Sequence, residues 1–272
     1  MEKRALIYSL YADPNIQLVD NEHWRCLCYS IQTLRQYNTH IPIVIWLNHL
    51  DLITEVEQAF IDTYAPIQLQ GFQTDNFLGQ TASAPNTHNN FHFELVFHKW
   101  PNAIATFDIT DYDRIMFLDC DTYFIRDVEI FFEKYTGDVV WYREDNCVWL
   151  QTHLEMPLAM NDGVFILPRQ TAARIRSFYL DQFNTTLEQL LENNKHIPNE
   201  HYQQLSWSCW QFTSYIMFAR HNIPMSVFAH KDMALSNELP YRELGEPFDY
   251  EFVCHHYFKC NTEKYIPELL TY

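Results

Sequence analysis

Glycine is scarce in this chain of 272 residues. There are only 5 glycines, and no two of them lie close together in the sequence. Both the G-x-G-x-x-G dinucleotide loop and the P-loop need clustered glycines, because the backbone itself has to wrap the phosphate groups. A Rossmann dehydrogenase and a P-loop kinase are therefore excluded. Any phosphate-bearing ligand has to be held by a metal ion or by local basic side chains.

Basic residues are also few. Lysine and arginine together number 18, against 35 aspartates and glutamates, which gives a formal net charge of −17 at pH 7. A field of that sign repels nucleic acids and anionic lipid surfaces, so we expect no nucleic-acid partner. Apolar residues make up 47% of the chain and aromatic residues 16%, which excludes disorder and supplies a large core.

Long apolar runs are missing as well. No stretch approaches the length of a membrane-spanning helix, so we expect no transmembrane segment, and the first residues do not resemble a signal peptide. The cysteines number 7, and an odd number without a secretion signal indicates reduced thiols. We therefore expect a cytoplasmic protein.

The spacing of apolar residues predicts strands that alternate with helices. Strands are expected at residues 4–11, 41–46, 67–69, 114–118, 138–141, 163–167, 225–228 and 252–256, and helices at 23–37, 51–64, 91–106, 170–193 and 200–220. Asn21 or Asp20 is the expected cap of the first helix, and the polar stretch 71–90 is typical of a binding loop. This alternation predicts an α/β fold with a mostly parallel central sheet, helices on both faces and a single domain over residues 1–272.

An acidic pair follows one of these apolar strands. The run 114–118 stops at Asp119, and Asp121 comes two residues later, at the end of the sheet where ligands bind. In extended backbone, side chains at i and i+2 project to the same side, where two carboxylates repel each other. A divalent cation removes this conflict, and oxygen ligands suit Mg²⁺ or Mn²⁺. The pair predicts a metal site, and the alternative is a solvated turn that happens to carry two acids.

The segment around this pair resembles the metal-binding segment of the GT-A-fold glycosyltransferases. Residues 112–121 follow the pattern Y-D-R-x-x-x-L-D-x-D of glycosyltransferase family eight, which includes glycogenin-like, galactinol-synthase-like and lipopolysaccharide galactosyltransferase-like enzymes. Upstream, Lys99 stands where that family has a basic residue that helps to hold the donor. Downstream, residues 161–164 are similar to the family pattern N-[SA]-G-V, whose first two residues touch the donor sugar.

The end of the chain resembles a third motif of the same family. Residues 254–259 are similar to H-x-x-G-x-x-K-P-W, whose histidine is a metal ligand. We favour His256 over His255 as this ligand, because the two residues that follow it match the spacer. Lys259 then replaces the glycine, and Lys259 and Lys264 are rivals for the diphosphate. A structural zinc site in this segment is an alternative, but the cysteine and histidine spacing fits no common zinc pattern.

The resemblance implies a GT-A fold over about residues 4–265, with a nucleotide-binding part over about 1–125 and a sugar and acceptor part over about 126–272. It implies transfer of a hexose from a nucleotide sugar, most simply a UDP-hexose, with retention of configuration and with Mn²⁺ or Mg²⁺ as cofactor. The resemblance leaves the acceptor open among a glycan, a lipid-linked sugar, a protein side chain and water. Asp119, Asp121 and His256 are the expected metal ligands. The expected donor-binding residues are Leu10, Tyr11, Ala12, Lys99, Cys120, Asn161, Asp162, Gly163, Lys259 and Lys264.

Catalysis is expected to depend on stabilising the leaving diphosphate, by the metal and by Lys99 with Lys259 or Lys264, and no nucleophile is assigned. The acceptor region is expected at Trp210 and Gln211, where the family usually has Asp-Gln.

Three alternatives differ in chemistry. A phosphatase of the haloacid-dehalogenase type would use Asp119 as its nucleophile, but Tyr123 stands where that family has threonine or valine. A nucleotidyltransferase would need a glycine-rich loop after Leu10, and none is present. A non-catalytic sugar-binding or nucleotide-binding protein of the same fold would fit the altered motif near the end of the chain.

Overall fold

The structure is a computed structural model that describes residues 2–72, 98–124, 126–137, 139–143, 153, 160–229, 233–235 and 254–256. Its central sheet contains seven strands in this order: β3 (Ile67–Gly71), β2 (Ile43–Leu47), β1 (Arg4–Leu10), β4 (Arg114–Leu118), β7 (Met160–Pro168), β6 (Val139–Arg143) and β8 (Met225–Val227). Strand β7 runs antiparallel to both of its neighbours, and the other strand pairs are parallel. The prediction of a mostly parallel sheet is confirmed.

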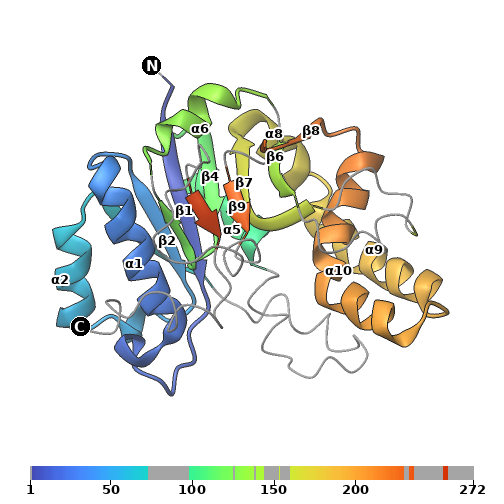
Figure 1. The fold of residues 1–272 in the computed structure, drawn as a ribbon, viewed down its shortest axis with the longest axis horizontal. Helices are drawn as coiled ribbons and strands as arrows, with labels where there is room; N and C mark the ends of the chain where they lie inside the picture. The colour runs from blue at the N-terminus through green and yellow to red at the C-terminus, as the bar shows by residue number, and fades with distance from the viewer. Residues whose placement is uncertain are drawn as a thin grey trace, which may run out of the picture.

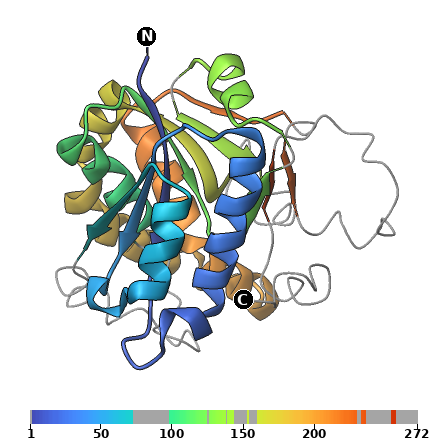
Figure 2. The same ribbon diagram turned by 90° about the vertical axis from the view of Figure 1, so that its left-hand side faces the viewer.

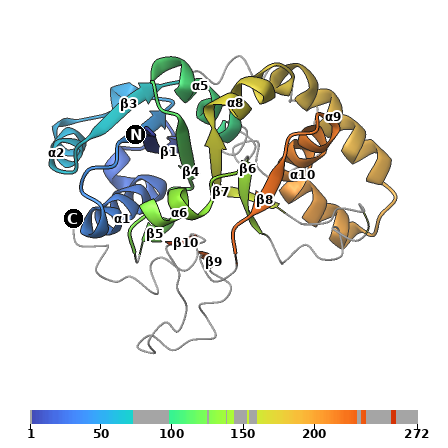
Figure 3. The same cartoon turned by 90° about the horizontal axis from the view of Figure 1, so that it is seen from above.

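A second, smaller sheet lies beside the first. It consists of β5 (Thr122–Phe124), β10 (Cys254–His256) and β9 (Met233–Leu235), with β10 in the middle (Figure 3). The sequence did not predict β5 or β9, because a strand of three residues is too short to show a periodic pattern. This sheet joins the end of the chain to the segment that follows β4.

Helices cover both faces of the central sheet, as predicted. On one face lie α1 (Glu22–Tyr37), α2 (Glu55–Thr63) and the short α6 (Glu129–Lys134), and on the other lie α5 (Lys99–Ile109), α8 (Arg169–Arg176), α9 (Tyr179–Asn194) and α10 (Asn199–Arg220). Two short 3-10 helices, η1 (Leu18–Asp20) and η2 (Leu50–Leu52), precede α1 and α2. Figures 1 and 2 show α1 and α2 side by side, with the sheet between them and α8 to α10. No helix in the described ranges is long and apolar enough to cross a membrane.

The alternation of side chains along β1 creates two cores. Ala5 and Ile7 pack into the core under α5, α8, α9 and α10, whereas Leu6 and Tyr8 pack into the core under α1. Successive side chains of a strand point to opposite faces, so a strand that is apolar on both faces has to be covered twice. All four residues are fully buried.

Helix boundaries follow their caps. The side chain of Asn21 accepts from the backbone N–H groups of His23 and Trp24, so Asn21 is the cap of α1. The helix expected from residue 51 begins only after Thr54, where Thr54 and Glu57 form a capping box. The helix expected over 170–193 is two helices, α8 and α9, which the predicted pattern did not separate. Parts of the expected segments 71–90, 91–106 and 252–256 lie outside the described residues.

Candidate active site

The candidate site forms where β4 and β7 meet, at the carboxyl end of β4. Because β7 runs antiparallel to β4, the start of β7 lies at this end, and Leu118 is the register partner of Val164. The backbone N–H of Asp119 donates to the carbonyl of Gly163 over 2.6 Å. The acidic segment 119–121 and the segment 161–163, which are far apart in the sequence, therefore lie side by side.

The acidic pair lies in a turn. The chain leaves β4 at Leu118, and the backbone N–H of Thr122 donates to the carbonyl of Asp119 over 3.1 Å, which closes a four-residue turn before β5. The expectation of extended backbone through Asp119 and Asp121 is therefore wrong, because the chain has to reverse into β5. The turn still brings both acids into the field of one cation, the ammonium of Lys99.

Lys99 is the first residue of α5 and the cation of the site. Its Nζ lies 2.7 Å from Oδ1 and 2.9 Å from Oδ2 of Asp119, and 3.5 Å from Oδ1 of Asp162. Burial opposes the charge of this ammonium, but the carboxylates of Asp119, Asp162 and Asp121 outweigh burial and hold the pKa of Lys99 above its ordinary value. Lys99 is therefore charged at neutral pH and bound to the acidic turn.

Asp162 is the most deeply buried carboxylate of the site, with only 2% of its side chain exposed. Burial raises its pKa, while Lys99 and the indole of Trp210 on α10 favour the charged form. Trp210 is itself buried and stands where the resembled family has an aspartate. The indole of Trp210 on α10 therefore lies against the buried carboxylate of Asp162 on β7.

Asn161 and Gly163 shape the start of β7. The side chain of Asn161 is buried, and its Oδ1 accepts from the backbone N–H of Gly163 over 2.7 Å. Gly163 in turn holds Asp119 through the backbone hydrogen bond described above. The segment 161–163 therefore supports the acidic turn directly. Gln211, the other residue of the expected acceptor region, is half-buried on α10.

A column of aromatic rings sets the positions of the three elements that carry the charges. Trp100, next to Lys99, stacks on Phe165 of β7 with ring centroids 3.9 Å apart and planes 9° apart. Phe165 stacks in turn on Phe117 of β4, at 4.9 Å and 7°. All three rings are buried, and each such pair contributes about 0.5–1.5 kcal/mol beyond its buried area. The distance between Lys99 and the carboxylates therefore depends on core packing.

The turn after β1 is held by a residue that the sequence interpretation missed. The backbone N–H of Ala12 donates to Oδ1 of Asn48 over 2.7 Å, and Nδ2 of Asn48 donates to the carbonyl of Ala12 over 3.0 Å. The side chains of Leu10 and Ala12 are fully buried, whereas Tyr11 is half-buried. A ligand at this turn would therefore meet Tyr11 and backbone atoms. The available signal was the position of Asn48, directly after the neighbouring parallel strand β2.

Cys120 points into the protein. Its side chain is buried, and Sγ donates to the carbonyl of Ser9 over 3.8 Å. Burial raises the pKa of this thiol well above its ordinary value, and the neighbouring carboxylates add to the effect. The thiol is therefore unreactive, and a donor contact at Cys120 would have to use its backbone.

Strand β10 brings the end of the chain to the acidic turn. His256 is the register partner of Thr122, and His255 pairs with the following residue of β5. Partner Cα atoms in antiparallel strands lie about 5 Å apart, and Thr122 directly follows Asp121. The backbone of both histidines therefore lies close to the acids, and the choice between His255 and His256 as a ligand stays open.

The acids of the turn fit a divalent cation. Asp119 already binds a cation with both carboxylate oxygens, its side chain is 22% exposed, and oxygen donors suit Mg²⁺ and Mn²⁺. Within the described ranges, no three His, Cys, Asp or Glu side chains form a complete cluster for a metal ion. Lys259 and Lys264 lie outside the described residues, so their expected role is untested.

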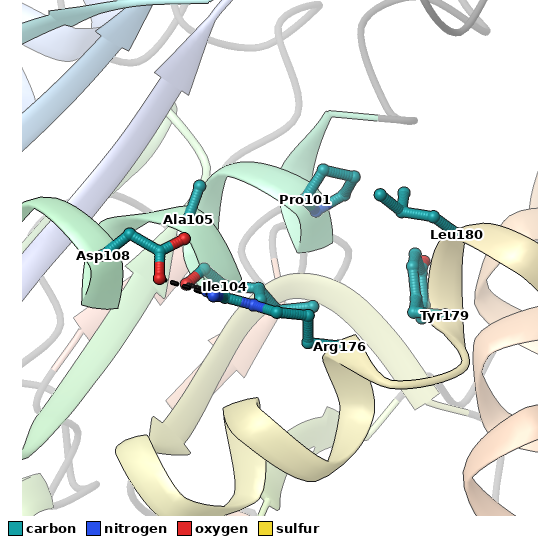
Figure 4. A pocket seen from close by; sticks show the side chains of 7 residues that line it. All are labelled: Pro101, Ile104, Ala105, Asp108, Arg176, Tyr179 and Leu180. Atoms are coloured by element: carbon teal, nitrogen blue, oxygen red, sulfur yellow. Dashed lines mark hydrogen bonds and ion pairs between the residues drawn. The ribbon is translucent and has the colours of Figure 1, made fainter.

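A separate cavity of about 250 Å³ lies between α5 and the start of α9 (Figure 4). It is lined by Pro101, Ile104, Ala105, Asp108, Arg176, Tyr179 and Leu180. Asp108 and Arg176 form an ion pair at this cavity, and its other lining side chains are mainly apolar. None of the acidic residues at the end of β4 lines it, so it is distinct from the candidate active site.

The fold of the chain matches the folds of solved glycosyltransferases. Mouse xyloside xylosyltransferase 1 in its apo form superposes with a TM-score of 0.57 at 14% identity, over 95% of this chain and 98% of that one. Galactosyltransferase LgtC, in complex with donor and acceptor sugar analogs, superposes with a TM-score of 0.57 at 12% identity, over 93% of this chain and 86% of that one. The chain has the fold of these GT-A glycosyltransferases, as the resemblance implied.

A family model extends this result from fold to family. The model described as "Mannosyltransferase putative" matches residues 17–152, which is half of the chain. The chain therefore belongs to this mannosyltransferase family and is a glycosyltransferase of the GT-A fold. A comparison with curated proteins gave no match. Family membership removes the support for a phosphatase that uses Asp119 as its nucleophile.

Proposed function

We propose that the protein transfers a hexose from a nucleotide sugar to an acceptor, with a divalent cation bound at the acidic turn. The observation that carries the proposal is the convergence of Asp119, Asp121, Asp162 and Lys99 at the carboxyl end of β4. Sugar-nucleotide chemistry needs this combination, because the departing diphosphate is anionic and requires cationic groups that are already in place. The register of β10 supports His256, or His255, as a further ligand.

The sugar and the nucleotide of the donor are inferred from different observations. The family description names mannose, which supports a mannose donor. The resemblance to family eight favours UDP as the carrier and retention as the stereochemical course. We expect the nucleotide to contact the turn after β1, at Leu10, Tyr11 and Ala12, and the sugar to contact Asn161 and Asp162. The acceptor, whether a glycan, a lipid-linked sugar or a protein, would approach from Trp210 and Gln211.

The cationic groups have distinct tasks. Asp119 and Asp121, with a histidine of β10, would hold Mn²⁺ or Mg²⁺, which when bound supplies Lewis-acid stabilisation of the leaving diphosphate. Lys99 stands at the first residue of α5, so its ammonium and the positive end of the helix dipole both favour an anion there. Lys259 or Lys264 would neutralise the remaining charge. A cytoplasmic location also stays a prediction.

A thermal-shift panel tests this function. UDP-, GDP- and CDP-linked mannose, glucose and galactose are each added with Mn²⁺ or with a chelator, and a cognate donor at 100 times its Kd would stabilise the protein by about 2.7 kcal/mol. We expect one nucleotide to raise Tm only in the presence of Mn²⁺. Asp121→Asn should keep the metal-free Tm but lose this rise and the turnover. The absence of metal-dependent stabilisation by every donor would refute the proposal.

A further inference from the structure

Lys99 occupies the carboxylate that a divalent cation would need. Its Nζ is within hydrogen-bond distance of both oxygens of Asp119, at 2.7 and 2.9 Å. A metal ion binds carboxylate oxygens at about 2.1 Å and repels an ammonium that shares them. Binding of a metal at Asp119 therefore requires Lys99 to move away from these oxygens.

The carboxylate of Asp162 is a second possible partner for the ammonium of Lys99. Oδ1 of Asp162 lies 3.5 Å from Nζ, just beyond the usual length of a charge-assisted hydrogen bond. The carboxylate of Asp162 is nearly inaccessible to water, so its charge depends on protein groups such as Lys99 and Trp210. Asp162 would gain from a closer ammonium, whereas the more exposed Asp119 can exchange Lys99 for a metal.

The exchange requires only a short movement of the Lys99 ammonium. The stack of Trp100 on Phe165 fixes the start of α5 against β7, which carries Asp162. The four-carbon side chain of Lys99 has rotatable bonds throughout, and closing the gap to Asp162 needs a shift of about 1 Å to reach an ordinary ion-pair distance. Only side-chain torsions of Lys99 have to change.

We propose that Asp162 is a positioning residue that receives Lys99 when Asp119 releases it to a divalent cation. The proposal rests on the metal-binding function proposed above and adds the way in which the site is loaded. While Lys99 pairs with Asp119 it competes with the metal. Once Lys99 pairs with Asp162 it stays at the site, next to the place where the diphosphate is expected. The loss of Asp162 should therefore weaken metal binding through Lys99.

The test measures Mn²⁺ binding directly, by the electron paramagnetic resonance signal of free Mn²⁺ in titrations without nucleotide. The proteins are the wild type, Lys99→Met, Asp162→Asn, the double variant, and Asp121→Asn as the control that identifies the site. Removing the competing cation in Lys99→Met should tighten Mn²⁺ binding at least about tenfold, as expected for a hydrogen bond between charged groups. Asp162→Asn should weaken binding about tenfold in the wild-type background.

The double variant separates the two ways in which Asp162 can act. If Asp162 acts by receiving Lys99, the effect of Asp162→Asn on Mn²⁺ affinity should be at least about fivefold smaller in the Lys99→Met background than in the wild-type background. If Asp162 acts only by its own charge on the metal, its effect will be as large or larger there, and the proposal is overturned. Lys99→Gln replaces Lys99→Met throughout if thermal unfolding shows that the latter does not fold.

The Mn²⁺ titrations distinguish failure of the Lys99 exchange from failure of the proposed metal site. Mn²⁺ binding that Asp121→Asn abolishes, without the expected coupling between positions 99 and 162, would refute only the exchange of Lys99. An absence of Mn²⁺ binding that depends on Asp121, in the wild type and in Lys99→Met alike, would refute the metal site itself.

Discussion

Replacing Lys99 by methionine removes the charge that compensates two carboxylates. Asp162 has only 2% of its side chain exposed and Asp119 has 22%. Loss of the Lys99 charge therefore destabilises the charged form of Asp162 more than that of Asp119. Breaking a buried ion pair on one side typically costs about 3–5 kcal/mol, because an uncompensated charge remains. In the absence of metal, we therefore expect Lys99→Met to lower the free energy of unfolding at pH 7 by about 3–4 kcal/mol.

Proton uptake by Asp162 limits this loss and makes it depend on pH. Its ordinary pKa is 3.8, and taking up a proton costs about 1.36 kcal/mol for each pH unit above that value. The loss of unfolding free energy that the Asp162 charge can cause is therefore limited to about 4 kcal/mol at pH 7 and about 2 kcal/mol at pH 5. A carboxyl group whose folded pKa is raised stabilises the fold below its unfolded pKa and loses that contribution as the pH rises. The difference between Lys99→Met and the wild type should therefore grow from pH 5 to pH 7.

Urea unfolding followed by circular dichroism, with chelator present, measures both effects. Adding Asp162→Asn to Lys99→Met removes the buried charge and should restore stability at pH 7 to within about 1 kcal/mol of the wild type. Lys195→Met is the matched control, because Lys195 pairs with Glu192 on the surface and should change stability by less than about 0.5 kcal/mol. An equal loss at both pH values, or no recovery in the double variant, would refute the reasoning.

Two further predictions concern the supports of the site. Trp100→Ala empties a fully buried position in the aromatic column and should cost about 3–5 kcal/mol in urea unfolding, whereas Val56→Ala, which is 68% exposed, should cost less than about 0.5 kcal/mol. A loss below about 1 kcal/mol for Trp100→Ala would mean that the column does not fix α5. Asn48→Ala frees both backbone groups of Ala12 and should raise the KM for the donor with little change in kcat. Steady-state kinetics checks this, and an unchanged KM would place the nucleotide elsewhere.

Most of the fold could be predicted from the sequence because its central strands are buried. The runs that form β1, β2 and β4 consist almost wholly of apolar residues, as expected for parallel strands covered on both faces. Elements that are short, such as β5, β9 and α6, have too few residues for a period to show. The division between α8 and α9 was missed because the residues around Ser177 include neither glycine nor proline, the usual marks of such a break.

Sequence motifs identified the candidate residues, but they did not predict the contacts between them. The sequence indicated the pair Asp119 and Asp121 from one segment, and Lys99 and Asp162 from two others. It did not indicate that Lys99 binds Asp119, or that Trp210 lies against Asp162. These relations join residues from β4, α5, β7 and α10, and contacts between distant segments leave no periodic trace in a single sequence.

The amino-acid sequence by itself determined the class of fold, the acidic pair and the families to which the chain could belong, because apolar runs, clustered acids and scarce glycine can be recognised without the tertiary structure. Tertiary structure alone decided that β7 runs antiparallel and carries Asp162 to Asp119, and that Trp100, Phe165 and Phe117 stack to place Lys99 between these acids. The physical reason is that ion pairing and ring stacking act over a few ångströms in space, whatever the separation along the chain.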